Sequence, residues 1–282
     1  MTEGTIGVVG VGTMGQGIAQ ILATSGRNVL LYDVATPQLS HAHEAISKAL
    51  SRLVEKEKLS DDAQAAALGR LRGTNTMEEL GNCEIIIEAA PEEPALKKQL
   101  FRDLSRLSKD TILASNTSSL SLTQLAAVCE HPERVVGMHF FNPVPVLKLV
   151  EVVRAEQTSD ATIARIESLS LQLNKIAVKI VDSPGFAVNR LLIPMINEAI
   201  FLVQEGVASM KDIDRAMQLG AAHPVGPLAL ADLIGLDVCL AIMETLQEGL
   251  GDPKYRPCPL LSRMVAAGHL GHKSGRGFYV YT

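Results

Sequence analysis

The sequence predicts a two-part fold: an α/β N-terminal domain with a mostly parallel sheet, followed by an all-α C-terminal domain. Short apolar segments alternate with helix-like segments up to residue 181, which is the rhythm of a parallel sheet with crossover helices. At residues 182–185, Asp-Ser-Pro-Gly, this pattern changes, and long helical segments follow. We therefore expect one domain over residues 1–183 and a second over residues 184–282.

Composition and charge narrow the class of protein. The 282 residues are 47% hydrophobic and 20% charged, as in a globular protein long enough for two domains. The net charge is −5 and no run of Lys or Arg occurs, so we expect no nucleic-acid partner. No apolar run approaches the ~20 residues of a membrane span, and Glu3 stands where a signal peptide is positively charged. We expect a cytoplasmic protein with no membrane association.

The cysteines are far apart in the sequence and form no CxxC pair. In a cytoplasmic protein, such spacing indicates reduced thiols and no metal site. The residues concerned are Cys83, Cys129, Cys239 and Cys258.

The N-terminal segment has the order strand, glycine-rich loop, helix, strand and acid. Residues 6–10 are predicted as a buried strand, residues 17–23 as a helix and residues 28–32 as a second strand, which ends at Asp33. The loop carries a GxGxxG pattern at Gly10, Gly12 and Gly15. In this context the pattern predicts a Rossmann-like dinucleotide-binding domain, because the glycines permit a tight turn and close approach to a pyrophosphate.

Asp33 bears on the choice of dinucleotide. A carboxylate at this place accepts hydrogen bonds from the ribose 2′-hydroxyl and repels a 2′-phosphate, which favours NAD over NADP. Beyond it, residues 36–57 and 60–68 are predicted as a projecting helical hairpin that interrupts the βαβ rhythm. Strands at residues 84–88 and 111–115 follow, separated by a helix over residues 94–107.

A predicted β-hairpin carries a histidine and a carboxylate. Residues 135–140 and 146–153 are predicted strands, joined by Asn-Pro-Val-Pro at residues 142–145. His139 lies six residues before Pro145 and Glu151 six after it (145 − 139 = 151 − 145), so a symmetric turn places them opposite each other. Such a pair is typical of a general acid or base, although a buried polar pair that only holds the hairpin together is equally compatible.

Polar residues also follow the strand at residues 111–115. Ser115-Asn-Thr-Ser-Ser119 stands at a strand end, where open α/β sheets bind ligands. Capping of the next helix explains part of this run. Its length favours ligand contact for the rest.

The C-terminal part is predicted to be helical, with helices at residues 186–204, 209–219, 227–246 and 259–267, and a strand-like tail at residues 273–281. Several of these helices are apolar over much of their circumference and need extensive burial, so we expect a homodimer through this domain. Asn189 lies near the start of the first helix, where an interface role is as compatible as a functional one. Lys273 is able to reach an anion or to remain solvated.

These motifs together resemble the short-chain 3-hydroxyacyl-CoA dehydrogenase family, and within it the bacterial 3-hydroxybutyryl-CoA dehydrogenases. The resemblance spans almost the full chain in family order. The motifs that carry it are Gly10-Val-Gly-Thr-Met-Gly15, Ala114-Ser-Asn-Thr-Ser-Ser119, His139-Phe-Phe-Asn-Pro-Val-Pro145, Lys148-Leu-Val-Glu-Val152, Pro184-Gly-Phe-Ala-Val-Asn-Arg190 and Gly275-Arg-Gly-Phe-Tyr279.

The resemblance implies roles for individual residues. It makes His139 the catalytic base with Glu151 as its partner, and Ser118 and Asn189 the donors to the reacting oxygens of an acyl-CoA substrate. Lys56 matches a family lysine near the CoA phosphate, but the family's serine nearby is replaced by Ala49. Contacts with NAD are implied for Gly10, Gly12, Thr13, Met14, Gly15, Asp33, Glu92, Lys97, Ser118, Asn142 and Lys273.

The implied reaction is NAD-dependent interconversion of a 3-hydroxyacyl-CoA, such as 3-hydroxybutyryl-CoA, and the 3-ketoacyl-CoA, such as acetoacetyl-CoA. One alternative is a dehydrogenase of free β-hydroxy acids. Those relatives generally use a lysine on the interdomain helix, where this chain has Asn189 and Arg190. Another alternative is a non-catalytic, crystallin-like NAD-binding protein, since a fold does not determine a function.

Overall fold

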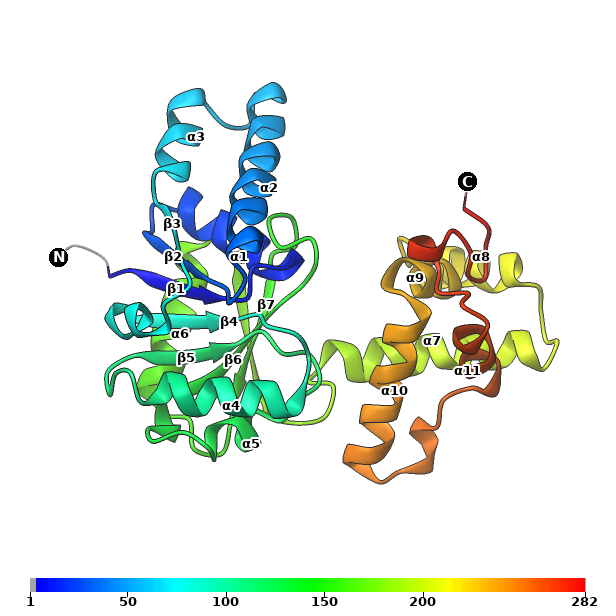
Figure 1. Ribbon diagram of the computed structural model, residues 1–282. Coiled ribbons are helices and arrows are strands. Elements are labelled where there is room, and N and C mark those ends of the chain that lie inside the picture. Colours follow the sequence, from blue (N-terminus) through cyan, green and yellow to red (C-terminus); the bar gives the residue numbers. More distant parts are fainter. Residues whose placement is uncertain (1–3, 282) are drawn as a thin grey trace. The chain divides into compact units, whose positions relative to one another are not determined.

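The computed structural model describes residues 4–281 and divides along the chain into two compact units, with the boundary between Asp182 and Ser183 (Figure 1). The first unit contains a sheet covered by helices, and the second is helical. This confirms the predicted fold class. Within residues 4–281 no helix combines the length and the apolar character that crossing a bilayer requires.

The first unit is built on a sheet in which eight strands are described, in the order β3-β2-β1-β4-β5-β6-β7-β8. Neighbouring strands run parallel except at the β6–β7 pair, which is antiparallel. The order changes direction at β1 and β4, a switch point of the kind where open α/β sheets bind ligands. The strands are β1 (Ile6–Val9), β2 (Val29–Tyr32), β3 (Leu71–Thr74), β4 (Ile85–Glu88), β5 (Ile112–Ser115), β6 (Val135–Phe140), β7 (Leu149–Arg154) and β8 (Ile176–Val181).

Helices cover both faces of this sheet and one pair extends beyond it. Helices α2 and α3 form the projecting hairpin that the sequence predicts (Figure 1). The Ser60 hydroxyl caps α3 by accepting a hydrogen bond from the Ala63 amide. The helices of this unit are α1 (Thr13–Thr24), α2 (Thr36–Glu55), α3 (Asp61–Leu68), α4 (Pro94–Ser105), α5 (Leu122–Ala126) and α6 (Asp160–Gln172), with 3₁₀ turns η1 (Met77–Asn82) and η2 (Pro132–Arg134).

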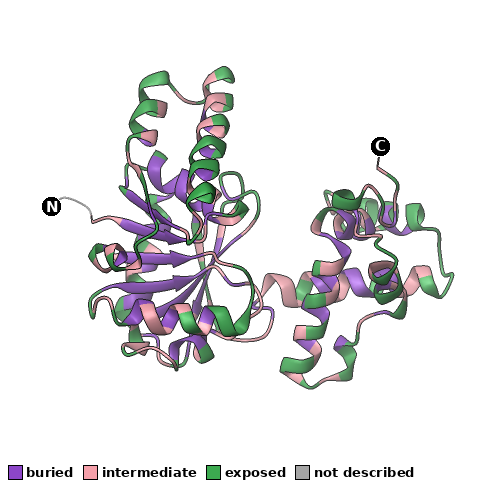
Figure 2. Cartoon of the chain, in the orientation of Figure 1, coloured by how far each residue is buried: buried purple, intermediate pink, exposed green. Residues whose placement is uncertain are grey.

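The central strands are buried on both faces, so they read as continuous apolar runs in the sequence (Figure 2). On one face, Val8 and Ile87 share an apolar cluster with Ile18 of α1, Ile46 of α2 and Ile166 of α6. Helices α4 and α5 lie against β5 and β6. This packing leaves the loops at the carboxyl ends of the strands as the place where polar side chains gather.

The second unit is a bundle around its own apolar cluster, which includes Ile196, Leu236 and Leu261. Its C-terminal tail is held by a buried carboxylate, since the Asp232 oxygens accept hydrogen bonds from the Phe278 and Tyr279 amides. The helices are α7 (Val188–Gln204), α8 (Met210–Gly220), α9 (Pro227–Ile234), α10 (Leu236–Leu250) and α11 (Pro259–Ala266), with 3₁₀ turns η3 (Pro253–Tyr255) and η4 (His272–Ser274).

The prediction of one long helix over residues 227–246 is wrong. The segment is broken at Gly235, whose φ of 104° lies outside the helical region, and α10 continues to Leu250. The Leu236 amide donates to the Leu270 carbonyl instead of continuing the α9 ladder. Apolar periodicity on both sides of the glycine conceals this break.

The strands also differ from the sequence predictions in three places. Strand β3 is not among the predicted strands, since Leu-Arg-Gly-Thr at an exposed sheet edge has little apolar character. Strand β7 begins at Leu149 rather than at residue 146, because the Val146 and Leu147 amides both turn back to the Pro143 carbonyl. The strand-like tail contains only isolated bridges, from Arg276 to Gly271 and to Val280.

Candidate active site

Strand register brings the polar loops of the first unit together at one edge of the sheet. Val9 of β1 pairs with Glu88 of β4, Glu88 pairs with Ser115 of β5, and Ser115 pairs with Gly137 of β6. The glycine loop, the segment after β4, the polar run after β5 and the His139 end of β6 therefore share the carboxyl edge. This edge includes the switch point between β1 and β4.

The glycine loop has the geometry of a phosphate-binding turn. Gly10 has a φ of 84°, and a Cβ there would lie 2.8 Å from the backbone of Ala89 and Ala90. A Cβ on Gly15 would lie 1.9 Å from the Gly10 carbonyl oxygen, so the helix packs directly against the turn. By contrast, a Cβ on Gly12 would meet nothing within 4 Å. Gly12 thus borders the open space into which a pyrophosphate fits.

The start of α1 leaves amide donors available for an anion. Gly12 is the N-cap and provides no side-chain cap, so amides of the first turn remain for a ligand. Asp33 stands beside the loop, where its carboxylate accepts hydrogen bonds from the Val11 amide at 3.3 Å and the Ala35 amide at 3.1 Å. These residues fit a dinucleotide, with the anion-binding turn and the ribose-selective carboxylate on adjacent strand ends.

His139 and Glu151 occupy directly opposite positions of the β6–β7 hairpin. The His139 Nδ1 lies 2.8 Å from the Glu151 Oε2, and the two side chains are 7% and 1% exposed. A carboxylate accepts only, so we assign the proton of the neutral ring to Nδ1, which leaves Nε2 as the acceptor. The Phe141 ring packs against the imidazole with centroids 4.6 Å apart. The hairpin thus holds the imidazole in one orientation.

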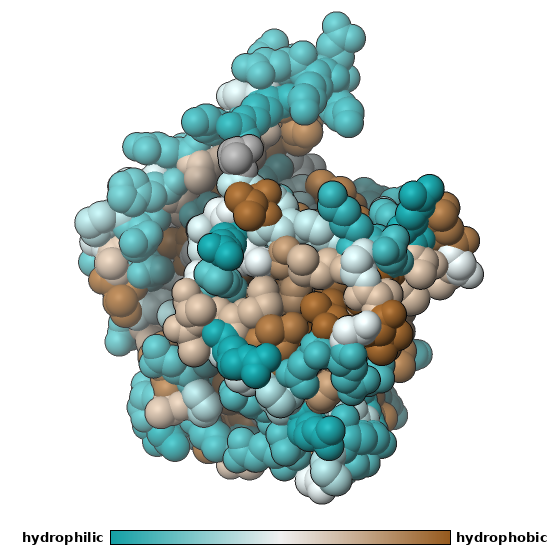
Figure 3. Space-filling model, turned by 90° about the vertical axis from the view of Figure 1, so that its right-hand side faces the viewer, coloured by the Kyte–Doolittle hydropathy of each residue, from teal (hydrophilic) through white to brown (hydrophobic). Residues whose placement is uncertain are grey.

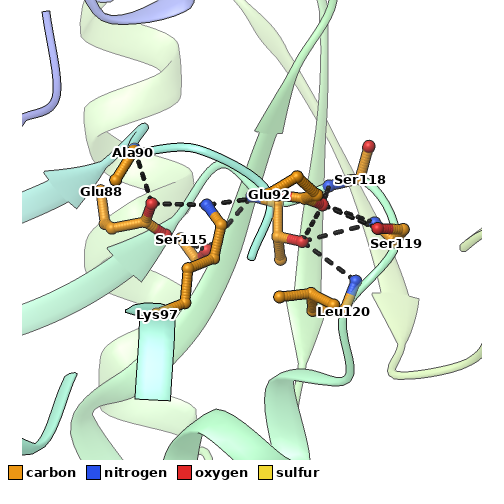
Figure 4. Close-up of polar contacts among 9 residues, drawn as sticks. Glu88, Ala90, Glu92, Lys97, Ser115, Ser118, Ser119 and Leu120 are labelled. Carbon is orange, nitrogen blue, oxygen red and sulfur yellow. Dashed lines mark hydrogen bonds and ion pairs between the residues drawn. The ribbon is translucent and has the colours of Figure 1, made fainter. Parts of the chain in front are cut away.

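Ser118 lies in a loop that is organised by Glu92. Its amide donates to the Glu92 Oε1 at 2.9 Å, and the Ser119 amide donates to the same oxygen at 3.1 Å. Figure 4 shows the Ser118 hydroxyl directed away from this carboxylate. Burial alone would raise the pKa of Glu92, but the Lys97 ammonium and the hydrogen bonds from residues 117–119 outweigh it and lower the pKa. Glu92 is therefore an anion that fixes the loop backbone.

Lys97 and Glu88 lie beneath this loop. The Lys97 Nζ is 2.5 Å from the Glu88 Oε1 and 3.2 Å from the Glu92 Oε2. The family resemblance implies a role for Lys97, whereas Glu88 is predicted only to end a strand. The sequence signal for Glu88 is an acidic side chain that closes an otherwise apolar, fully buried strand, since a buried carboxylate needs partners.

Asn142 lies at the mouth of a groove between α1, α2 and the turn after β6. Ala49 of α2 lines the same groove. The other lining residues are Thr13, Gln16, Gly17, Gln20, Ala45, Ile46, Pro143, Val144 and Pro145. Met14, the second residue of α1, packs partly buried against the core of the unit.

The remaining predicted residues lie elsewhere. Lys56 is exposed at the C-cap of α2, on the projecting hairpin. Asn189 is half-buried in the first turn of α7, and Lys273 lies in η4, both in the second unit. The Lys273 ammonium forms an ion pair of 2.6 Å with Asp237 of the same unit. Among the predicted site residues of the first unit, Lys56 alone stands on the projecting hairpin, whereas the others lie in α1, in α4, in β6 and β7 or in loops at the carboxyl ends of the strands.

The four cysteines are free thiols, and burial raises the pKa values of Cys83 and Cys129 to about 11. Across residues 4–281, no group of three or more His, Cys, Asp or Glu side chains is arranged to hold a metal ion.

Comparison with known proteins identifies the family. Residues 5–183 match the family model described as 3-hydroxyacyl-CoA dehydrogenase, NAD binding domain, and residues 185–281 match 3-hydroxyacyl-CoA dehydrogenase, C-terminal domain. A probable 3-hydroxybutyryl-CoA dehydrogenase of Bacillus subtilis is 52% identical over 275 residues, which cover 97% of this chain and 96% of that protein. A 3-hydroxybutyryl-CoA dehydrogenase of Bradyrhizobium diazoefficiens is 47% identical over 277 residues, covering 98% and 94%.

A solved structure agrees. The crystal structure of an (S)-3-hydroxybutyryl-CoA dehydrogenase from Ralstonia eutropha superimposes with a TM-score of 0.97 at 50% identity, covering 100% of both chains. Both family models, the related sequences and this structure lead to the same conclusion. The chain belongs to the 3-hydroxyacyl-CoA dehydrogenase family.

Proposed function

We propose that the chain catalyses the NAD-dependent interconversion of 3-hydroxybutyryl-CoA and acetoacetyl-CoA. One observation carries the chemistry: the buried His139–Glu151 pair, 2.8 Å apart, stands on the sheet edge that also holds the glycine loop. A base beside a dinucleotide site is what oxidation of an alcohol requires. The 52% identity to a probable 3-hydroxybutyryl-CoA dehydrogenase supports the choice of substrate.

The glycine loop and Asp33 are the residues that would hold NAD. Gly10, Gly12 and Gly15 permit the close approach of a pyrophosphate to the start of α1, and Asp33 would accept from the ribose hydroxyl. When bound, the nicotinamide supplies the hydride acceptor in oxidation and the donor in reduction. By resemblance, Thr13, Met14, Glu92, Lys97, Asn142 and Lys273 also contact it.

His139 carries the proton of the reaction. In oxidation, its neutral Nε2 accepts the proton of the C3 hydroxyl, and in reduction the imidazolium returns a proton to the ketone oxygen. Glu151 holds the Nδ1 proton and stabilises the imidazolium that forms. Because Glu151 is 1% exposed, water competes little for its carboxylate.

Ser118 and Asn189 would donate hydrogen bonds to the substrate oxygens, where negative charge develops. Ser118 suits this role because Glu92 holds its backbone while its hydroxyl points away from that carboxylate (Figure 4). Lys56 would pair with a phosphate of CoA. Ala49 lines the groove beside Asn142 and provides no hydroxyl, so this chain would bind CoA without a serine contact there.

An assay with a panel of substrates tests the proposal. We expect rapid NADH oxidation with acetoacetyl-CoA, slower oxidation with longer 3-ketoacyl-CoAs, and none with free β-keto acids. His139→Gln serves as the control for catalysis, since it should bind NADH without turnover. Preference for the free acids supports a β-hydroxyacid dehydrogenase instead. NADH binding without turnover of any 3-ketoacyl-CoA supports a non-catalytic protein.

A homodimer through the second unit is the assembly that we propose. Several large apolar side chains of this unit are more than half exposed, among them Leu191, Leu219, Leu233 and Val280. Figure 3 shows apolar side chains gathered near the middle of the face in view, with hydrophilic side chains around them. Contiguous apolar surface of this kind is typical of an interface. Light scattering after size-exclusion chromatography at micromolar concentration should give the dimer mass, and a monomer mass would contradict the proposal.

A further inference from the structure

Five residues form a closed ring of hydrogen bonds and ion pairs beneath the Ser118 loop (Figure 4). They come from three places in the sequence: the end of β4 and the loop after it, the first turn of α4, and the end of β5 with the run that follows. The members are Glu88, Glu92, Lys97, Ser115 and Thr117.

Lys97 is the cation of the ring and connects its two carboxylates. Its ammonium pairs with Glu88 at 2.5 Å and with Glu92 at 3.2 Å, while its side chain is only 1% exposed. A buried ammonium is stable only when its charge and donors are satisfied. Lys97 therefore ties the position of Glu92 to that of Glu88.

Glu92 transmits this position to the loop. Its Oε1 accepts hydrogen bonds from the Thr117 hydroxyl at 2.5 Å and from the Ser118 amide at 2.9 Å. It also accepts from the Ser119 amide at 3.1 Å and the Ser119 hydroxyl at 2.9 Å. Four donors on one oxygen leave the Ser118 backbone little freedom.

Glu88 closes the ring from the other side. Its Oε2 accepts from the Ser115 hydroxyl at 2.6 Å, and the Ser115 oxygen accepts from the Thr117 amide at 3.1 Å. Its Oε1 accepts from the Ala90 amide at 2.7 Å and from Lys97. Both carboxylate oxygens of this buried side chain thus accept hydrogen bonds, from the loop after β4, from α4 and from the end of β5.

We propose that Glu88 is a positioning residue for Ser118, acting through Lys97 and Glu92 on one side and through Ser115 and Thr117 on the other. This inference rests on the proposed function of Ser118. Glu88 itself is 1% exposed and touches neither substrate nor cofactor in this role. It determines where the Ser118 hydroxyl stands, and misplacing a catalytic donor by about 1 Å can cost ~10²-fold in rate.

The Glu88→Gln variant disturbs the ring without removing bulk. A carboxamide presents one oxygen and one NH₂ group, whereas both Glu88 oxygens now face donors. At one of the two oxygen positions a hydrogen bond to Glu88 is therefore lost, and the new NH₂ group faces the donor that made it. Hydrogen–deuterium exchange of residues 116–120 should become about tenfold faster or more in this variant, because the loop amides open more often. Unchanged exchange would overturn the proposal, whatever substrate the protein uses.

A double-mutant cycle tests the link to Ser118. With acetoacetyl-CoA and NADH, we expect Glu88→Gln to lower kcat by about 10- to 100-fold, a larger effect than its effect on the Kd of NADH. In a Ser118→Ala background, the same change should lower kcat little further, because its effect passes through Ser118. Full additivity of the two changes would contradict the proposal, as would a loss confined to NADH binding.

Two further variants make the result interpretable. Ser115→Ala removes the two contacts of the Ser115 hydroxyl, with Glu88 and with the Thr117 amide, but leaves the Lys97 side of the ring intact. It should therefore lower kcat in the same direction but less, even if Glu88→Gln folds poorly. Glu84→Gln is the control, since Glu84 directly precedes the first residue of β4 and pairs with Arg27 and, at 3.0 Å, with Arg165 rather than with the ring. It should leave kcat and loop exchange unchanged. If wild-type protein turns over no 3-ketoacyl-CoA, the proposed function fails, whereas the exchange measurement still decides the role of Glu88.

Discussion

The His139 Nδ1 lies 2.8 Å from the Glu151 Oε2, and the two residues are directly paired across β6 and β7. This relationship is produced by strand register, which is stiffer than a loop, so the imidazole is oriented before any substrate binds. Both side chains are nearly buried. The hairpin therefore holds His139 in the orientation that the proposed general base requires.

Replacing Glu151 by Gln should leave a folded protein that is a poor catalyst. The amide no longer stabilises the imidazolium, and it can present its NH₂ group to Nδ1, which favours the wrong tautomer. We expect kcat to fall by about 10²–10⁴-fold with little change in NADH affinity. Steady-state kinetics with fluorescence titration of NADH checks both. A variant with near-normal kcat would reduce the pair to a structural role.

Two glycines of the loop should respond differently to alanine. A Cβ on Gly15 would lie 1.9 Å from the Gly10 oxygen, so Gly15→Ala should lower the free energy of unfolding by about 3 kcal/mol. A Cβ on Gly12 meets nothing within 4 Å, so Gly12→Ala should keep wild-type stability and lose NADH affinity at least about tenfold. Urea unfolding and NADH titration measure the two effects. Normal NADH binding by Gly12→Ala would exclude this loop as the pyrophosphate site.

Asp33 should control the choice between NADH and NADPH. Its carboxylate would repel a 2′-phosphate. In Asp33→Asn, the ratio of kcat/KM with NADH to kcat/KM with NADPH should therefore fall by about tenfold or more. Asparagine retains an oxygen for one of the Val11 and Ala35 amides, so the loop should remain folded. Val34→Ala is the control, because this neighbour is 81% exposed. An unchanged ratio in Asp33→Asn would show that selectivity lies elsewhere.

The Ser118 loop should lose stability at acidic pH. Burial alone would raise the pKa of Glu92, but Lys97 and the loop donors lower it below the ordinary value of 4.5. A lowered pKa in the folded state means that Glu92 stabilises the fold fully above pH 4.5 and loses this contribution as the pH falls through its folded-state pKa. The difference in Tm between wild type and Glu92→Gln should therefore shrink as the pH falls below about 4.

Glu93→Gln provides the comparison for this pH dependence. Glu93, like Glu92, is exposed, but it provides no side-chain cap to α4, so its replacement should leave the Tm profile as in wild type. A constant difference between wild type and Glu92→Gln across the acid range would contradict a stabilising role for the ionised Glu92 carboxylate.

Much of the fold was predictable because its signals are local. The buried strands β1, β4 and β5 are uninterrupted apolar runs, and the α2–α3 hairpin begins its second helix at a Ser60 cap. Strand β3 and the break at Gly235 were not predictable in this way. The first depends on pairing with β2 rather than on apolar character, and the second on a backbone conformation within a continuous apolar pattern.

The residues of the candidate site likewise fall into those that local sequence patterns predict and those that meet only in the tertiary structure. The equal spacing of His139 and Glu151 from the turn predicted their pairing, because residues equally far from a hairpin turn lie opposite each other. Glu88 was overlooked because its partners, Ser115 and Lys97, lie 27 and 9 residues away and meet only when β4, β5 and α4 are assembled. Local sequence patterns reveal residues that share an element, whereas the ring beneath Ser118 is a product of tertiary structure.

The most direct test of the central claim is the rate of NADH oxidation with acetoacetyl-CoA, compared between wild type and His139→Gln under identical conditions. If His139 moves the substrate proton, the wild-type protein turns over and the variant is slower by about 10²–10⁴-fold, while both bind NADH equally. Near-wild-type turnover by His139→Gln, or no turnover of acetoacetyl-CoA by the wild type, would contradict it.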